Sequence, residues 1–295
     1  MKVLPFKIPK PENGTLYIQN YVGESFYEKL HQHKEIQISL IAAGEGTYII
    51  GDCVGEFKKN DIFVIGEDLP HVFKRDITFI DKTTMISLFF TKSSYGEGFF
   101  NLSEFEHFQD FFNEAVLGFQ VLSDSNKIFI LLSQIEKLSK YHQFTSLLEI
   151  IRLISETKKR TLSSLINLKK YAGNEGKRMS DIFQYTMNNY HTEISLDQVS
   201  DIANLTPNAF CRYFKQRTNK TFVNFLIDIR IGNACKLLTK NNDLNITEIS
   251  YKSGFNNLAN FNRKFKAIKG LTPSEYRKKH QISSQLHAVF KTEIL

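Results

Sequence analysis

The chain of 295 residues has little cysteine and no long apolar segment. Cys53, Cys211 and Cys235 are odd in number and form no CxxC pair, so neither a disulfide framework nor a zinc site is predicted. No apolar run approaches the roughly 20 residues that span a bilayer. The N-terminus carries prolines and lysines where a signal peptide has its apolar core. We therefore expect a soluble, cytoplasmic protein that does not enter a membrane.

An excess of negative charge is absent as well, and the positive excess is confined to one part of the chain. The formal net charge is +7. Residues 180–280 hold 15 Lys and Arg against 8 Asp and Glu, which leaves 23 of each kind in the remainder. A basic balance localised in this way is what binding to nucleic acid phosphates requires.

What the sequence does contain is a repeat near its C-terminus. Each copy has an apolar stripe, a turn, and then two phenylalanines four residues apart with an arginine between them. The copies are offset by about 50 residues before the turn and about 51 after it. Such a repeat indicates a duplicated unit, here a helix-turn-helix whose second helix enters the major groove. The matching residues are Leu196, Val199, Ala203, Leu205, Phe210, Arg212, Phe214, Lys215, Thr221 and Phe225, then Ile246, Ile249, Ser253, Phe255, Phe261, Arg263, Phe265, Lys266, Thr272 and Tyr276.

Local signals predict where the helices of the repeat begin and end. Gly254 and Gly270 suit the left-handed residue that closes a helix. Thr206-Pro207 and Thr272-Pro273 each offer an N-cap followed by proline at the first helical position. Between the copies, residues 221–239 form one amphipathic stretch, which as a helix is roughly 28 Å long. Successive major-groove faces lie about 34 Å apart, so one helix of this length can hold two readers on one side of the duplex.

The second copy resembles the signature of the AraC/XylS family of transcription regulators, and the likeness covers Ser180 to about His280. The resemblance implies a cytoplasmic, sequence-specific regulator of transcription, usually an activator, that binds double-stranded DNA, works with RNA polymerase and forms a homodimer. The residues that carry it are Ile246, Glu248, Ile249, Ser250, Gly254, Phe255, Phe261, Arg263, Phe265, Lys266, Gly270, Thr272, Pro273, Tyr276 and Arg277.

Charged residues on the second helix of each copy are the first candidates for DNA contact. Arg212 and Arg263 occupy equivalent positions, and arginine paired with guanine is the commonest specific contact. A phosphate contact or a salt bridge within the domain is the alternative. Lys215 and Lys266 are expected to touch phosphates.

Uncharged residues complete the predicted DNA-binding set. Asn208 and Asn262 suit adenine or phosphate, and Asn257 lies at the start of the second reading helix. Leu258 and Ala259 stand where many members of the family place polar base readers. Either these two contact thymine methyl groups, or the second copy chiefly adds affinity for the DNA backbone.

The N-terminal part resembles the sensory cupin of AraC-type proteins. Short β-branched and aromatic segments between about residues 15 and 90 predict a sandwich or small barrel. The resemblance rests on His31-x-His33-x-Glu35, Gly44-x-Gly46, Asn60-Asp61 and Pro70-His71.

Three interpretations of these histidines are open: a small-molecule pocket, a structural polar cluster, or a metal site. A metal-binding cupin has a carboxylate four or five residues beyond the second histidine, where this chain has Gln37 and Ile38. His31, His33, Glu35 and Gln37 share one side of a strand. We therefore predict an effector site made by His31, His33, Gln37 and His71, with no metal and no cofactor.

A helical pattern follows the strands and suggests an α+β chain: an N-terminal β cupin-like barrel with a helical segment, then an all-α double helix-turn-helix domain. The stripe at Lys127–Lys140 favours a dimer interface, whereas the one at Phe105–Phe112 suits a partner or the cupin equally well. The predicted divisions are 1–100 for the cupin, 101–170 for the dimerisation helices, 171–179 for a linker, 180–280 for the DNA-binding domain, with Ser180 capping its first helix, and 281–295 for a tail.

The preferred interpretation is a ligand-responsive transcription regulator that is not an enzyme. The first alternative is a regulator without an effector, whose cupin serves only for assembly. The second is a cupin enzyme with a metal on His31, His33 and His71, for which the sequence offers no further catalytic residues.

Overall fold

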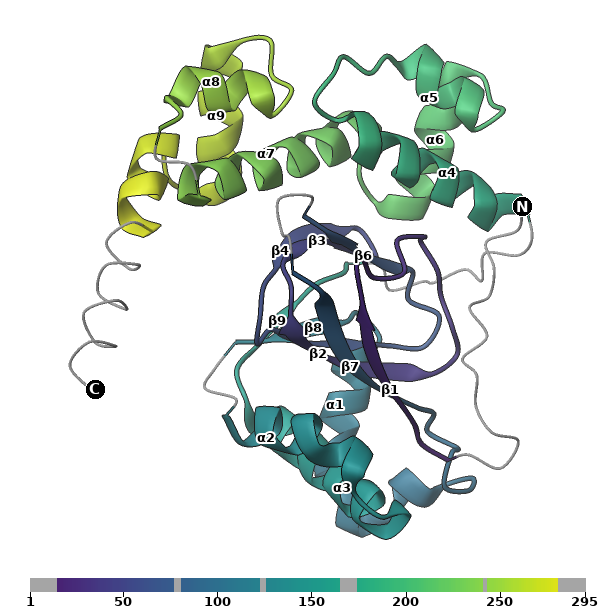
Figure 1. Cartoon of the computed structure of the whole chain (residues 1–295). Helices are drawn as coiled ribbons and strands as arrows, with labels where there is room; N and C mark the ends of the chain where they lie inside the picture. Colours follow the sequence, from purple (N-terminus) through teal and green to yellow (C-terminus); the bar gives the residue numbers. More distant parts are fainter. Residues whose placement is uncertain (1–14, 77–80, 123–125, 165–173, 241–242, 281–295) are drawn as a thin grey trace, which may run out of the picture. The chain divides into compact units, whose positions relative to one another are not determined.

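The computed structural model describes residues 15–76, 81–122, 126–164, 174–240 and 243–280 (Figure 1). The chain divides into two compact units, one ending at Asp181 and the other beginning at Ile182. The first unit holds antiparallel sheets with helices, and the second is helical. This confirms the predicted α+β organisation.

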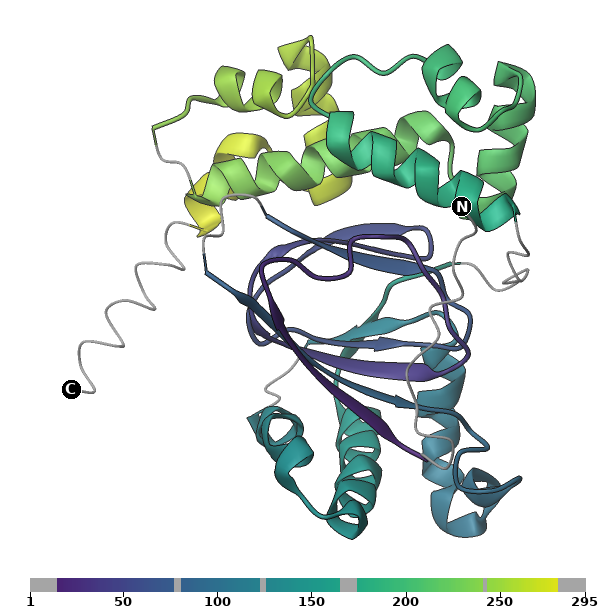
Figure 2. The same cartoon turned by 45° about the vertical axis from the view of Figure 1, so that its right-hand side comes forward.

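Two antiparallel sheets form the framework of the first unit, and Figure 2 shows their strands curving around a common interior. Strands buried on both faces, such as β5, link two cores, because alternate side chains point to opposite sides. The six-stranded sheet runs in the order β1 (Tyr17–Gly23), β7 (Thr83–Phe90), β2 (Ile36–Ala43), β5 (Ile62–Ile65), β8 (Phe119–Val121) and β9 (Lys159–Thr161), and the three-stranded sheet in the order β4 (Cys53–Phe57), β3 (Gly46–Ile50) and β6 (His71–Arg75).

The two cores of this unit are clearly separated along β5. Phe63 and Ile65 belong to the core that also contains Tyr48, Phe57 and Phe73, residues of the smaller sheet. Ile62 and Val64 join the core that the helices cover. That second core also contains side chains of α1 (Gln109–Ala115), α2 (Asn126–Gln134) and α3 (Lys140–Glu156).

The described residues of the predicted dimerisation segment, 101–122 and 126–164, therefore belong to the same folded unit as the strands before them. They also supply β8 and β9, two three-residue strands that the sequence analysis missed. Within the predicted dimer helix, Ile128, Leu132 and Ile135 are buried in the core shared with the sheet. The apolar stripe is thus accounted for inside one chain, although Ile130 remains 52% exposed. A dimer stays a prediction.

The second unit consists of short helices gathered along one long helix, α7 (Figure 1). A further helix covers residues 273–280. In the part of the chain that the structure describes, no helix is both long and apolar enough to cross a membrane. The bounds are α4 (Asn174–Asn189), α5 (Leu196–Ile202), α6 (Pro207–Thr218), α7 (Phe222–Lys240), α8 (Ile246–Lys252) and α9 (Leu258–Lys269).

The predicted start of the first helix at Ser180 is wrong. Helix α4 already begins at Asn174, so residues 174–179 of the predicted linker are helical. Met179, Ile182 and Phe183 are buried at helical spacing, and this stripe extends the helix through the serine. Residues 171–173 and the tail 281–295 lie outside the described residues.

Each half of the second unit has its own aromatic core. Phe210 and Phe214 of α6 pack with Phe222 and Phe225 of α7, with ring centroids 5.4 to 5.5 Å apart for three of these pairs. In the other half the core combines α7 with α8 and α9. Its members include Ile231, Ala234, Cys235, Leu238, Ile249, Phe255, Phe261 and Phe265.

Candidate DNA-binding surface and histidine cluster

The duplication inferred from sequence is reproduced in the backbone. Helices α5 and α8 each have 7 residues, and α6 and α9 each have 12. The N-caps before the turn, Ser195 and Asn245, are 50 residues apart and both complete a capping box. The N-caps after it, Thr206 and Asn257, are 51 apart.

The extra residue of the second copy lies late in its turn. The amide of Leu205 donates to the carbonyl of Ser200, and that of Phe255 donates to the carbonyl of Ser250, so the two copies are still in the same register there. Because the N-caps Thr206 and Asn257 are equivalent, the extra residue is Asn256, directly before the N-cap of α9. The Asn257 side chain accepts from the amide of Asn260 at 2.9 Å and so caps that helix.

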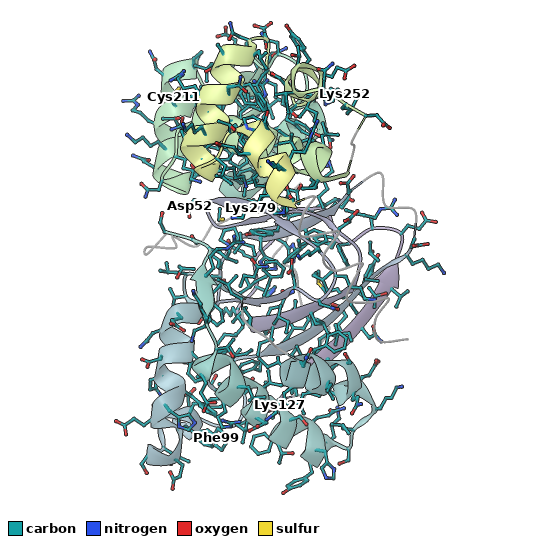
Figure 3. The ribbon with its side chains drawn as sticks, turned by 90° about the vertical axis from the view of Figure 1, so that its left-hand side faces the viewer. Asp52, Phe99, Lys127, Cys211, Lys252 and Lys279 are labelled. Carbon is teal, nitrogen blue, oxygen red and sulfur yellow. The ribbon has the colours of Figure 1, made fainter. Side chains whose placement is uncertain are left out.

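Helix α6 presents a polar face opposite its buried phenylalanines. Asn208, Arg212 and Lys215 follow the spacing i, i+4, i+7 and are all exposed. Cys211, labelled in Figure 3, is exposed beside them at the position equivalent to Asn262. The sequence analysis did not include this cysteine among the candidate contact residues, although the 51-residue offset makes it equivalent to Asn262.

Helix α9 keeps the arginine and the lysine of this face, but Ala259 stands at the position equivalent to Asn208. Asn262, Arg263 and Lys266 are exposed, and the Arg263 guanidinium donates to Asn260 Oδ1 at 3.0 Å. Leu258, in contrast, is half-buried and packs against the hydrophobic core of its own half. Of the predicted contact residues, Asn257 thus caps α9 and Leu258 packs inward, while the other six occupy exposed faces.

A cluster of three histidines lies in the first unit, where two distant segments meet. The backbone amides of His31 and His71 each donate to the other residue's carbonyl, at 3.1 and 2.9 Å. The ring centroids of His31 and His33 lie 4.2 and 5.0 Å from that of His71. The structure thus brings together the three histidines and Gln37 that the sequence analysis grouped.

Hydrogen bonds determine which ring nitrogen carries the proton. Nδ1 of His31, His33 and His71 lies 2.9, 2.9 and 2.8 Å from the backbone carbonyls of Lys29, Glu35 and Leu69. A carbonyl only accepts, so each Nδ1 donates, and Nε2 of each neutral ring carries a lone pair. Possible ligand atoms of the three rings lie within 4.8 Å of one another.

Gln37 completes this cluster. The Gln37 amide atom placed as Oε1 lies 3.0 Å from Nε2 of His33 and 3.1 Å from Nε2 of His71. The amide atom placed as Nε2 lies 2.7 Å from Ser39 Oγ. Ser39 in turn contacts Ser87 at 2.8 Å. Two arrangements satisfy the imidazole lone pairs: the amide NH2 group donates to both rings, or a cation lies between the rings and the amide oxygen. The serines were missed, although Ser39 follows Gln37 on the same strand face.

Burial keeps these histidines uncharged. Loss of solvation is the main cause that lowers the pKa of His31 to about 4 and the pKa of His33 below its usual value. The pKa of His71 lies well below its usual value, because the ring is buried and a charge on His31 or His33 would repel its own. The cluster therefore offers neutral imidazoles, the form that accepts hydrogen bonds or binds metal ions.

We expect the first unit to lose stability between pH 6.5 and 5. In the unfolded chain the histidines titrate near pH 6.5, whereas their folded pKa values are lower, so the unfolded state binds more protons in this range. The stabilising contribution is complete above about pH 6.5 and is lost as the pH falls, by about 2 kcal/mol for His31 at pH 5. Denaturant unfolding at several pH values measures it.

The exposed His107 supplies the control for this experiment. His107→Gln should keep the full pH dependence, whereas His31→Gln should remove the part due to His31 and leave the parts due to His33 and His71. A stability that stays constant from pH 7 to pH 5 in the unsubstituted protein would contradict the neutral cluster.

Comparison with known proteins shows that the repeat is similar to helix-turn-helix transcription regulators. A family model described as "Helix-turn-helix domain" matches residues 199–279. The HTH-type transcriptional regulator YdeC of Bacillus subtilis is 26% identical over 90% of this chain and 90% of its own length. An HTH-type regulator of Pseudoalteromonas carrageenovora is 35% identical over 32% of this chain, which spans 55% of that protein. A solved structure of a probable AraC family regulator from Rhodopseudomonas palustris is 19% identical, covers 35% of this chain and 97% of its own, and has a TM-score of 0.34.

Proposed function

The chain is a DNA-binding transcription regulator of the AraC type, and from that premise we propose that its N-terminal unit senses a small polar molecule and thereby controls activation of transcription. The observation that carries the proposal is the pairing of two matched reading helices with a buried cluster of neutral histidines on a separate folded unit. A homodimer in the cytoplasm that engages RNA polymerase belongs to the same proposal.

The exposed faces of α6 and α9 support DNA reading in two adjacent grooves. Each carries one arginine and one lysine at equivalent positions. Helix α7 has 19 residues, roughly 28 Å at 1.5 Å per residue. That length approaches the about 34 Å between successive major-groove faces on one side of the duplex.

The chemistry of the cluster supports a ligand that donates hydrogen bonds. The neutral imidazoles of His33 and His71 direct their Nε2 lone pairs at Gln37, whose amide can present either its oxygen or its nitrogen. A hydroxyl-bearing molecule can replace the amide NH2 group as donor. A divalent metal ion would be held by neutral ligands alone, since Gln37 stands where the metal-binding pattern has a carboxylate. We therefore favour a polar effector over a metal ion, whose stoichiometric presence in the purified protein would instead favour the metal-dependent alternative.

A calorimetric titration with and without operator DNA tests the sensor. The effector is first found by a thermal-shift screen, because a molecule that binds the folded state raises the unfolding midpoint. We expect operator DNA to change effector affinity about 5- to 150-fold, and the effector to change DNA affinity by the same factor. His71→Ala should abolish effector binding and leave unliganded DNA binding intact, whereas His107→Ala should change neither.

Two outcomes would contradict the sensor. An effector that binds equally well with and without DNA would remove the switch, since a ligand shifts an equilibrium only through its differential affinity. Regulation that is unchanged by His71→Ala would favour a regulator whose N-terminal unit serves assembly alone.

A further inference from the structure

A contact between the two halves of the DNA-binding unit centres on Arg230 of α7. Its Nε donates to the carbonyl of Tyr190 at 2.8 Å, and its NH2 group donates to the carbonyl of Thr192 at 2.8 Å. Tyr190 and Thr192 lie between α4 and α5, in the first half. The guanidinium carbon also lies 5.8 Å from the centre of the Phe255 ring, in the turn of the second half. We call Tyr190, Thr192, Arg230, Gly254 and Phe255 the Arg230 joint.

Gly254 brings the second turn directly against the first half. A Cβ at this position would lie 2.2 Å from the carbonyl oxygen of Tyr190 and 2.8 Å from Nε of Arg230. The equivalent residue of the first copy is Asn204, which adopts the same left-handed conformation with a φ of 50°. Conformation alone therefore admits asparagine here. Glycine is required at 254 because the backbone of the other half approaches so closely.

The charge of Arg230 is directed into the protein. Its side chain is partly buried, and its Nε and NH2 groups donate to backbone carbonyls rather than extending toward the exposed faces of α6 and α9. Hydrogen bonds from a charged donor are stronger than neutral ones, and two from one planar group restrict rotation. The joint therefore fixes the angle between the halves, and α7 fixes their separation by packing into both cores.

We propose that Arg230 determines the spacing between the two DNA subsites that α6 and α9 read. This inference rests on the proposed reading of DNA by both helices. A rigid pair of readers binds tightly only when both subsites have the matching separation, because no reorganisation is needed on binding. A loosened pair loses some affinity for that separation and accepts others more readily.

The experiment compares spacing preference rather than affinity alone. The full-length protein selects its site from a random duplex library, and variants of that site then receive one base pair more or less between the subsites. One base pair rotates the second subsite by about 35° around the duplex and shifts it by about 3.4 Å. We expect the unsubstituted protein to lose at least about tenfold in affinity, equivalent to misplacing a base contact. Arg230→Met should lose less than about threefold.

Control variants separate the joint from loss of charge and from loss of fold. Lys252→Met removes an exposed cation from α8 and should keep the full spacing penalty. Arg230→Lys retains one donor group, so its spacing penalty should fall between those of the unsubstituted protein and Arg230→Met. Gly254→Ala disturbs the joint from the other side and should relax spacing as Arg230→Met does, so it decides the matter if Arg230→Met does not fold.

Each outcome has a distinct meaning. An unchanged spacing penalty in folded Arg230→Met or Gly254→Ala protein would overturn the role of Arg230. A selection from which the unsubstituted protein enriches no sequence would instead overturn the proposed DNA reading. Enrichment of sites that contain a single subsite would show that only one helix reads DNA, and would also overturn the spacing role.

Discussion

Replacing Arg212 or Arg263 with alanine is expected to weaken binding to the cognate DNA site by about 1–3 kcal/mol, or about 5- to 150-fold. Both arginines are exposed on the faces of α6 and α9 that lie opposite buried phenylalanines. They occupy equivalent positions in two helices of equal length. Arginine can donate two parallel hydrogen bonds to guanine, and alanine removes both. Fluorescence anisotropy with labelled operator DNA measures the loss.

The affinity of Arg212→Ala and of Arg263→Ala for random duplex DNA shows whether each arginine contacts a base or a phosphate. A base contact costs affinity for the operator more than for random duplex, whereas a phosphate contact lowers both equally. Arg212 is expected to show the first behaviour. Arg152→Ala is the matched control, because this partly exposed arginine pairs with Glu149 and Glu156 on the first unit. Unchanged operator affinity in both Arg212→Ala and Arg263→Ala would refute the assignment of these faces.

The helix-turn-helix repeat was predictable because its signals are local. Thr206 with Pro207 starts a helix, and Gly254 and Gly270 adopt the positive φ angles that end one. These residues act within a few positions of themselves, so a sequence shows them directly. The extra residue in the second turn was also visible, as a change in the offset between the copies.

Features that depend on distant partners were missed. Strands β8 and β9 have three residues each, too few for a recognisable alternation, and they exist because each pairs with a neighbouring strand. The Arg230 joint connects residues 38 and 40 positions apart through backbone carbonyls, which have no sequence signature. The prediction that Ser180 caps a helix was wrong. Serine is a good N-cap, but the buried stripe through Met179 and Ile182 continues the helix on both sides of this residue.

The histidine cluster lies between these cases. Alternation along a strand placed His33 and Gln37 on one side, and a resemblance added His71. The carbonyl partners that set the protonated nitrogen of each ring were not predictable, because they depend on the course of the backbone around residues 29, 35 and 69. The identity of the atoms offered to a ligand therefore comes from the structure alone.

DNA binding is also expected to depend steeply on salt. If the exposed Lys215 and Lys266 each neutralise one phosphate, they contribute about −1.8 to the slope of log K against log salt, and any further phosphate contact makes the slope steeper. The two lysines alone then account for a fall in affinity of about 12-fold between about 50 and 200 mM salt. The positive excess of residues 180–280, 15 basic against 8 acidic, favours this outcome.

The two lysines allow the slope to be assigned to residues. Lys215→Ala and Lys266→Ala together should reduce its magnitude by about 1.8 and weaken operator and random DNA to the same extent, since phosphates carry no sequence information. Lys127→Ala, on the first unit, is the matched control and should leave the slope unchanged. Affinity that hardly changes with salt would exclude phosphate contacts as the main source of binding. A slope that survives the double substitution would place those contacts on other cations of the second unit, and α6 and α9 would then have to enter the grooves by another face.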